Sequence, residues 1–527
     1  MVKGAMSTSE QGHDGADGAS KTPAESPRPE LSTARKISIL IALILTTTLY
    51  ATTLLIVATV LPQIQGTMSA TADEIAWVVT FNILATAIAT PMSGWLSARF
   101  GMRKVMIWSM TGFTVATLMC GLSESLEALV FWRILQGAFG APSTPLTQSI
   151  LLNTFEKKHH GMVLGIFGIG VVMGPVVGPV LGGAMAEIYT WRWAFYVLVP
   201  VGVLSVSSLY LCLLEDGRRS SARLDWTGFL ALSVAMSCVQ LVLSRGQRQD
   251  WFDSAEIMLE TVIAGVAMWV FVIHSLTARA PFLNPRHLLD RNYAVGLLLV
   301  TMYGMLNFTP LVLLPPLLRE HMGFSEYFIG VIIGFRGVGG MIGFLAAGFA
   351  SRFDPRVTMI SGFGMLFVAG VWLMSMNLEM SVFSLGANAL LQGVAIGTIW
   401  VPMTVVTFAN IRSRALAETS AVFHLLRNLG SSFFISLCVA EIVRSSGANY
   451  AYMVEFITPF NERLSLPWVL GAWDVGSARG LASISGEIGR QAAMAGYLNA
   501  FGLFTAACAV AMPLVLLARR PRAAGEK

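Results

Sequence analysis

Ionisable side chains inside long apolar segments are the residues of this sequence whose types and positions could do chemistry. Arg133, Arg336 and Arg427 each lie in an apolar run, and His424 precedes Arg427 by one helical turn. A charge at the centre of a bilayer costs at least about 2.5 kcal/mol, so each arginine is expected to face a bundle interior, either as a functional charge or as a structural anchor. His424 can titrate near neutral pH and is a candidate proton relay, with a neutral packed histidine as the competing interpretation.

Carboxylates are expected only near the ends of the apolar segments. Glu74 is the best acidic candidate, because it lies one turn before Trp77 and Val78, at a point where a cavity could open. The competing interpretation is an ordinary acid at a helix N-terminus, where the helix dipole favours a negative charge. The other carboxylates closest to apolar segments are Asp73, Glu260, Glu418 and Glu441.

A stripe of glycines and prolines within residues 162–186 is the most informative local pattern. Its members are Gly170, Gly174, Pro175, Gly178, Pro179, Gly182 and Gly183. Four of the glycines recur every four residues and so share one helix face, against which another backbone can lie closely. Tight packing alone is one interpretation. Two prolines on the same stripe also add bendability, which static packing does not require, and this favours a role in motion.

Four amide side chains in apolar segments are candidates for lining a cavity. They are Asn82, Gln136, Gln148 and Asn307. Hydrogen bonds between membrane helices explain them equally well.

The composition indicates that the elements positioning these side chains are membrane helices. Of 527 residues, 55% are hydrophobic and 12% are charged, about half the charge of an ordinary soluble domain. Fourteen apolar segments can be placed, each long enough to span or nearly so. They lie near residues 37–62, 75–96, 105–122, 128–151, 162–186, 193–214, 226–243, 257–276, 293–318, 327–350, 357–376, 380–408, 420–443 and 493–517.

The distribution of basic residues predicts the topology. With an N-terminus in the cytoplasm, 24 of the 35 Lys and Arg residues fall on the inner side and 8 on the outer side. This bias predicts both termini in the cytoplasm and an even number of spans. The basic residues form no dense run, so we expect no nucleic-acid partner. The outer residues 444–492 make the longest connection, and residues 1–36 and 518–527 are predicted cytoplasmic tails, the first disordered.

Internal similarity predicts two related halves. Gly94-Trp-Leu-Ser-Ala-Arg99 is followed 253 residues later by Ala347-Gly-Phe-Ala-Ser-Arg352, and Leu135-Gln136-Gly137 recurs as Leu391-Gln392-Gly393 after 256 residues. We therefore predict an all-α membrane protein with a six-helix bundle over residues 37–214 and a second over 293–517. The two helices at 226–276 are then an insert. Parallel halves of this kind are a recurring transporter plan, with the substrate site between them.

These motifs in this order resemble the major facilitator superfamily, and specifically its 14-span drug:proton antiporter branch. The glycine stripe fills every defining position of that superfamily's antiporter motif. The segment after the second span resembles its loop motif through Gly94, Arg99, Gly101, Arg103 and Lys104. Arg133, Gln136 and Gly137 resemble the fourth-span motif, and Trp191-Arg-Trp193-Ala-Phe195 resembles the signature of the branch.

Two departures from the family pattern bear on energy coupling. Thr53 stands where members of the branch often carry an Asp in the first span, and Ala98 replaces an acid that is common in the loop motif. The usual proton carrier of the first span is therefore missing. The resemblance implies proton coupling, but these residues do not supply it.

The resemblance implies a secondary active multidrug exporter in the bacterial inner membrane. It would move amphipathic or cationic organic compounds outward in exchange for protons, without a cofactor. Its expected partners are small-molecule substrates, membrane lipid and a periplasmic adaptor protein. A lipid or metabolite exporter with weak or no proton coupling is the alternative that Thr53 and the lack of deep carboxylates favour. An enzyme is disfavoured, because the sequence has no P-loop, HExxH or GxSxG motif.

Overall fold

The protein is helical throughout the residues that the computed structural model describes, which are 32–214, 223–350, 354–458, 460–466 and 473–519. The first helices are α1 (Thr33–Met68), α2 (Ala72–Phe100), α3 (Met102–Leu122), α4 (Leu126–Gly140), α5 (Ser143–Thr154), α6 (His160–Ile188), α7 (Trp193–Tyr196) and α8 (Leu198–Cys212). They are followed by α9 (Trp226–Arg245), α10 (Ala255–Thr277), α11 (Arg291–Pro316), α12 (Glu326–Ala350), α13 (Pro355–Met374), α14 (Val382–Phe408), α15 (Leu416–Val454) and α16 (Ala478–Val515). The predicted tails at 1–36 and 518–527 lie largely outside this part of the chain, and α1 already begins at Thr33.

Thirteen helical segments in the described part of the chain are long and apolar enough to cross a membrane. Helices are expected in a chain this apolar, because a helix satisfies its own backbone hydrogen bonds where no water can do so. The all-α membrane fold predicted from the sequence is therefore confirmed.

The span expected at residues 128–151 is interrupted. The chain forms α4 and α5 with a break at Ala141 and Pro142, and each of the two helices is too short to cross a membrane alone. Pro142 has no N–H to donate, and its ring crowds the preceding helical turn, which weakens the helix at this point. Hydropathy alone did not show this break, because both sides of it are apolar.

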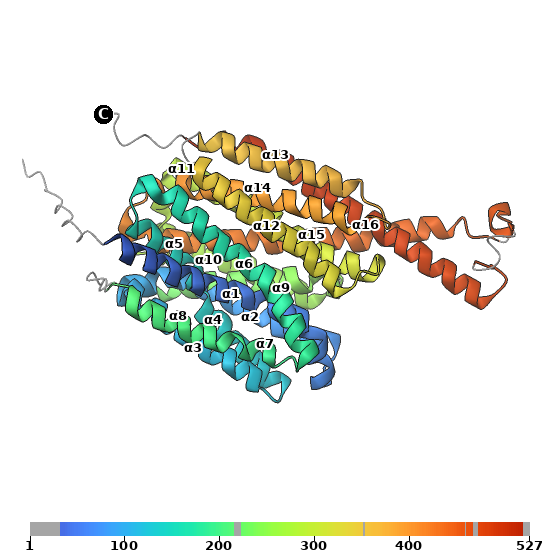
Figure 1. The fold of residues 1–527 in the computed structure, drawn as a ribbon, viewed down its shortest axis with the longest axis horizontal. Coiled ribbons are helices and arrows are strands. Elements are labelled where there is room, and N and C mark those ends of the chain that lie inside the picture. Colours follow the sequence, from blue (N-terminus) through green and yellow to red (C-terminus); the bar gives the residue numbers. More distant parts are fainter. Residues whose placement is uncertain (1–31, 215–222, 351–353, 459, 467–472, 520–527) are drawn as a thin grey trace, which may run out of the picture.

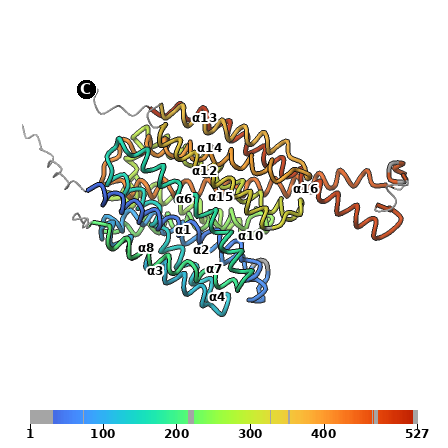
Figure 2. The backbone as a smooth tube through the Cα atoms, in the orientation of Figure 1, coloured from blue at the N-terminus to red at the C-terminus, as the bar shows by residue number. Residues whose placement is uncertain are grey.

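The helices run side by side along one axis and pack in two groups (Figures 1 and 2). In the first, α6 packs on α1, α4 lies between α2 and α3, and α8 packs on α3. In the second, α14 contacts α12 and α13, while α15 packs between α11 and α16. The groups meet where α6 packs on α12 and where α15 packs on α2 and α5. The start of α1 and the end of α16 lie at the same end of the molecule, which we call the inner end.

The helix pair α9 and α10 bridges the two groups from the side. α9 packs on α10 and also contacts α2 and α15. Asp225 caps α9 by accepting from the Gly228 amide at 3.0 Å, and it also accepts from the Phe282 amide at 3.0 Å, with His274 Nε2 at 2.9 Å. Burial raises the pKa of Asp225, but these hydrogen bonds outweigh burial and hold the pKa below its ordinary value. The carboxylate thereby ties the start of α9 to the segment that leads into α11.

The connection expected at residues 444–492 is largely helical. α15 continues to Val454 and α16 begins at Ala478, so the two helices project beyond the rest of the molecule as a hairpin (Figure 1). Tyr450 Oη lies 2.9 Å from Ser485 Oγ within this hairpin. A helix of 39 residues is about 58 Å long, nearly twice the hydrocarbon thickness of a bilayer. Hydropathy marks only the apolar part of such a helix and therefore assigned its polar continuation to a loop.

Candidate functional site

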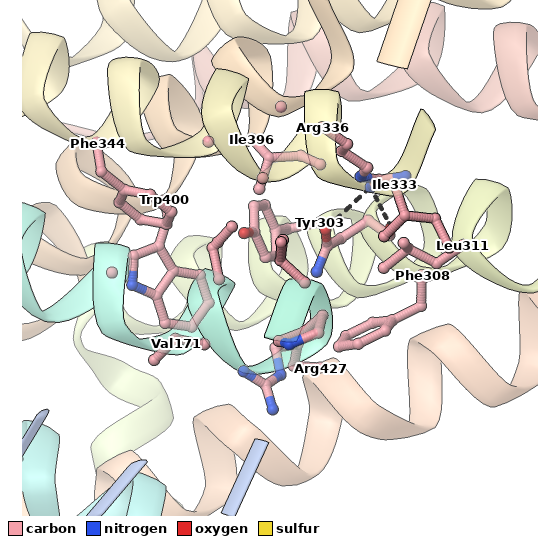
Figure 3. Close-up of a pocket in the computed structure, with 18 residues that line it drawn as sticks. Val171, Tyr303, Phe308, Leu311, Ile333, Arg336, Phe344, Ile396, Trp400 and Arg427 are labelled. Carbon is pink, nitrogen blue, oxygen red and sulfur yellow. Dashed lines mark hydrogen bonds between the residues drawn. The ribbon is translucent and has the colours of Figure 1, made fainter. Parts of the chain in front are cut away.

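A cavity lies between the two groups of helices (Figure 3). It has a volume of about 680 Å³, the space at its mouth included, and α6, α11, α12, α14 and α15 line it. The aromatic residues of its wall are Tyr303, Phe308, Phe344 and Trp400.

Arg336 reaches this cavity from α12 and is held by neutral oxygens. It donates to Gln392 Oε1 at 3.0 Å and to Asn307 Oδ1 at 3.2 Å, and it also donates to the Asn307 carbonyl. Gln392 donates in turn to Asn388 Oδ1 at 2.6 Å. The guanidinium is therefore fixed in position by three oxygen atoms that carry no net charge.

Arg427 reaches the cavity from α15 and is held mainly by aromatic rings. Its guanidinium carbon lies 5.8 Å from the ring centroid of Phe308 and 5.7 Å from that of Trp400. Nε and one amino group donate to the side chain of Asn428 at 3.3 and 3.0 Å. Attraction between a cation and an aromatic face is strongest where water is excluded, so the rings hold Arg427 without neutralising it.

Arg133 is buried away from this cavity, in the first group of helices. Its Nε donates to the Val78 carbonyl at 3.1 Å, and it also donates to Gln136 Oε1. Gln136 donates to Thr117 Oγ1, and Asn82 donates to the Arg133 carbonyl, both at 2.7 Å. Arg133, Gln136 and Asn82 thus form an internal network between α2, α3 and α4.

The two networks reflect the internal repeat. Gln136 and Gln392 occupy matching positions of the two halves, and each accepts a hydrogen bond from a buried arginine. The arginine comes from α4 in the first half and from α12 in the second. The arginine–glutamine pair therefore forms within α4 in one network and between α12 and α14 in the other, and Arg336 lines the cavity whereas Arg133 does not.

The glycine stripe of α6 faces α1. A Cβ added at Gly174 would lie 2.5 Å from Ala51 Cβ, and one added at Gly178 would lie 2.8 Å from the Thr52 carbonyl oxygen. Thr48 Oγ1 donates to the Gly170 carbonyl at 2.8 Å, and Gly182 packs on Ile56. Pro179 and Gly183 belong to the same helix. A Cβ added at Gly183 would lie 3.9 Å from Thr59 Cγ2, so this glycine, unlike the other four, leaves room for a side-chain carbon.

The opposite face of α6 contacts the second group of helices and the cavity. Val172 and Val176 fit against Gly340 and Gly337 of α12, which have no side chains to obstruct them. Pro175 lies between the two valines and lines the cavity. The helix that carries the stripe therefore connects α1 on one side with the cavity on the other.

Contacts between the two groups lie on the inner side of the cavity. Gln148 Oε1 accepts from Ser420 Oγ at 3.0 Å and lies 2.6 Å from His424 Nε2. The His424 ring stacks near Trp400, with centroids 5.8 Å apart, so it lies beneath the cavity wall. Lys157 Nζ adds a hydrogen bond to the Ala409 carbonyl at 3.0 Å.

The residues of the predicted loop motif lie in the last turns of α2, at Gly101 and in the first turn of α3. Gly94 packs on the backbone of Glu418, where an added Cβ would lie 2.8 Å from Cα. Gly101 has a φ of 89°, a conformation that glycine adopts without strain. Arg103 donates to the Tyr210 carbonyl at 2.8 Å, while Arg99 and Lys104 are exposed.

Glu74 and Thr53 lie apart from the cavity. Glu74 forms a capping box with Thr71, whose amide and hydroxyl each donate to Oε2 at 2.9 Å. Thr53 is buried and donates to the Leu49 carbonyl of its own helix at 2.9 Å. The structure therefore places Glu74 in the helix N-terminal role that was its competing interpretation.

The sequence profile described as "Major Facilitator Superfamily" matches residues 42–435, which include α6, the cavity and the inner-end contacts. The chain belongs to the major facilitator superfamily. Its relatives include multidrug export protein EmrB of Escherichia coli K12, which is 31% identical over 436 residues, 82% of this chain and 85% of that protein. Fatty acid resistance protein FarB of Neisseria gonorrhoeae is 26% identical over 464 residues, 87% and 91% of the two chains.

Solved structures support the same fold for this major facilitator protein. The crystal structure of the human organic anion transporter MFSD10 superposes with a TM-score of 0.60 at 13% identity, covering 91% of this chain and 99% of that one. The identity is too low to carry function, so this similarity concerns the fold.

Several cavity residues of this major facilitator protein were not predicted from the sequence. Tyr303, Phe308 and Trp400 line the cavity, but aromatic residues are common in apolar spans and their spacing does not show which face is inward. Gln392, which holds Arg336 at the cavity, could have been found, because the internal sequence repeat matches it with Gln136. Of the amide candidates, Asn307 lines the cavity, whereas Asn82, Gln136 and Gln148 bind other side chains or carbonyls.

Replacing Gln148 by leucine is expected to open the inner end. The change leaves the Ser420 hydroxyl and His424 Nε2 without their common acceptor. Each neutral hydrogen bond contributes about 1 kcal/mol, so closure should weaken by about 10- to 30-fold. The measurement is the thiol-labelling rate of a Gly348→Cys variant without other cysteines, because that side chain would lie at the α6–α12 contact, 3.5 Å from Met162.

Gln240→Leu is the matched control for this labelling experiment. Gln240 is buried on α9, outside the inner-end contacts described above. Labelling should therefore stay at the parental rate in Gln240→Leu and rise in Gln148→Leu. Equal rates in the two variants would mean that the Gln148 contacts do not hold the inner end closed.

Proposed function

We propose that this major facilitator protein is a secondary active exporter that carries amphipathic organic compounds out of the bacterial cytoplasm by alternating access. The observation that carries the proposal is the cavity between the two helix groups, with the contacts of Gln148, Ser420 and His424 at its inner end. Rocking of one group against the other would open that end and close the opposite one. The relative named as a multidrug export protein, 31% identical over most of the chain, supports export of several compounds.

We further propose the topology that the basic residues predict. α4 and α5 together would make one broken span, which gives fourteen spans, with both termini in the cytoplasm and the protein in the inner membrane. The first group of helices and the second would be the two six-helix bundles, with α9 and α10 as the insert. Exchange for protons is the coupling that the family resemblance implies.

Accumulation of a panel of dyes and drugs, in cells with and without the protein at two external pH values, tests this proposal. We expect lower accumulation with the protein, and a larger difference at the more acidic external pH if protons drive export. Equal accumulation of every compound in both strains would remove export from consideration. A quantitative blot of the membrane fraction ensures that the compared cells contain the protein.

A lipid or metabolite exporter with weak or no proton coupling is the second candidate. The observation that favours it is the cavity wall, which contains no carboxylate among the described residues. The relative named for fatty acid resistance is compatible with it. Transport in proteoliposomes with and without a pH gradient separates the two candidates, because gradient-independent export would exclude obligatory exchange for protons.

The projecting hairpin of α15 and α16 is the surface on which we would place a periplasmic adaptor. Tyr452 and Phe456 are exposed there, 61% and 54% respectively, beyond the length that a bilayer covers. Co-purification of an adaptor with the intact protein, and its loss when both aromatic residues are replaced by serine, would support this placement.

A further inference from the structure

The cavity contains two positive charges that no described carboxylate neutralises. Arg336 is hydrogen-bonded to neutral oxygens, and Arg427 is hydrogen-bonded to Asn428 and placed over two aromatic rings. Within the described ranges, no Asp or Glu lines the cavity or forms an ion pair with either guanidinium. Burying a charge is unfavourable unless an opposite charge accompanies it. An anion in the cavity would therefore be stabilised by its walls.

The rest of the cavity wall indicates the chemistry of the part of the bound molecule that carries the anionic group. Val171, Val172, Ile333 and Ile396 line the cavity with the aromatic rings, and these four aliphatic side chains form no hydrogen bonds. Such a surface suits an apolar body, because binding removes apolar area from water.

We infer that the preferred substrates of this exporter are amphipathic organic anions, whose acidic head binds Arg427 and whose apolar body lies along α6 and α12. This inference rests on the proposed function and names the class of compound that the same cavity takes. It also disfavours the cationic compounds that the family resemblance implied, because a cation would enter a site that already carries two positive charges.

Arg427 is the residue that receives the acidic head. Arg336 already donates to three oxygen atoms of Asn307 and Gln392. Arg427 donates through Nε and one amino group only to Asn428 among the described residues, so its second amino group is left for the cavity. Figure 3 shows the two arginines on different sides of Tyr303, with Arg427 close to Phe308. Arg336 then contributes a fixed positive potential, and Arg427 makes the direct contact.

Binding of three compounds with the same chain to the purified protein tests the inference. The probes are dodecanoate, its methyl ester and dodecyltrimethylammonium, and the measurement is displacement of a fluorescent amphipath below the critical micelle concentration of each probe. A hydrogen bond to a charged group contributes more than a neutral one, so dodecanoate should bind about 10- to 100-fold more tightly than the ester. The cation should bind more weakly than the ester.

Arg427→Gln should reduce the preference for dodecanoate over the ester to less than about threefold while the ester still binds, since the lost interaction is charge-assisted. Arg427→Lys should retain much of the preference, and it keeps the test possible if the glutamine variant does not fold. Arg479→Gln is the matched control, because this arginine is exposed on the projecting hairpin. Its preference should equal that of the parent.

Two outcomes would overturn the inference. One is tighter binding of the cation than of dodecanoate by the parent protein. The other is an unchanged anion preference in folded Arg427→Gln. Efflux of the three probes from loaded proteoliposomes shows whether the inferred substrate class or the proposed exporter function is wrong. Export of the ester without an anion preference would refute only the substrate class, whereas binding without export of any probe would refute the exporter.

Discussion

Replacing Gly174 by leucine should abolish export while leaving folded protein in the membrane. A Cβ at this position would lie 2.5 Å from Ala51 Cβ and 2.7 Å from the Thr52 amide nitrogen, so α6 would have to move away from α1. The same helix presents Val172 and Val176 to α12, and Pro175 to the cavity. Displacing α6 therefore disturbs the packing between the two helix groups as well as the cavity wall. Drug accumulation should rise to the level of cells without the protein.

Gly183→Ala provides the control for this prediction within the same motif. An added Cβ there meets only Thr59 at 3.9 Å, an ordinary van der Waals distance. Accumulation should remain at the parental level in this variant. Normal export by Gly174→Leu, with the protein present in equal amount, would show that contact between α6 and α1 is not needed for transport.

Replacing Gln136 by leucine should strongly destabilise the first group of helices. The substitution removes the oxygen that accepts from Arg133 and the amide that donates to Thr117. Arg133 is only 1% exposed, so its charge would lose a partner without gaining water. Losing a hydrogen bond to a charged group costs about 1.5–3 kcal/mol, which should lower the thermal transition of the purified protein and its yield.

A double substitution distinguishes the effect of an unpaired buried charge from the effect of the altered side-chain shape at position 136. In Arg133→Met with Gln136→Leu, the charge and its partner are removed together, so the protein should be more stable than Gln136→Leu alone. Gln491→Leu, at an exposed position of α16, should leave the transition unchanged. A double variant no more stable than Gln136→Leu would mean that the buried charge is not the cause of the loss.

The sequence predicted the membrane helices well because hydropathy responds to the surroundings of each segment. It could not predict the break at Pro142 within an apolar run, or the helical continuation of α15 beyond the membrane. Burial of the three arginines followed from the cost of a charge in lipid. Their different roles did not, because periodicity leaves open which neighbour a helix face meets, and only packing shows that Arg336 and Arg427 share a cavity while Arg133 does not.

The unneutralised guanidinium groups have a consequence for the energy source of transport. A bacterial cytoplasm is electrically negative, so a monovalent anion that leaves it moves down the membrane potential. Each elementary charge gains about 2.3 kcal/mol per 100 mV, which alone supports an outward concentration ratio of about 50. With anionic cargo, a cavity wall free of carboxylates in the described residues is no obstacle to export against a concentration gradient. The charge on the cargo would then couple export to the membrane potential. Members of the branch often carry an acidic residue in the first span for coupling, where this chain has Thr53.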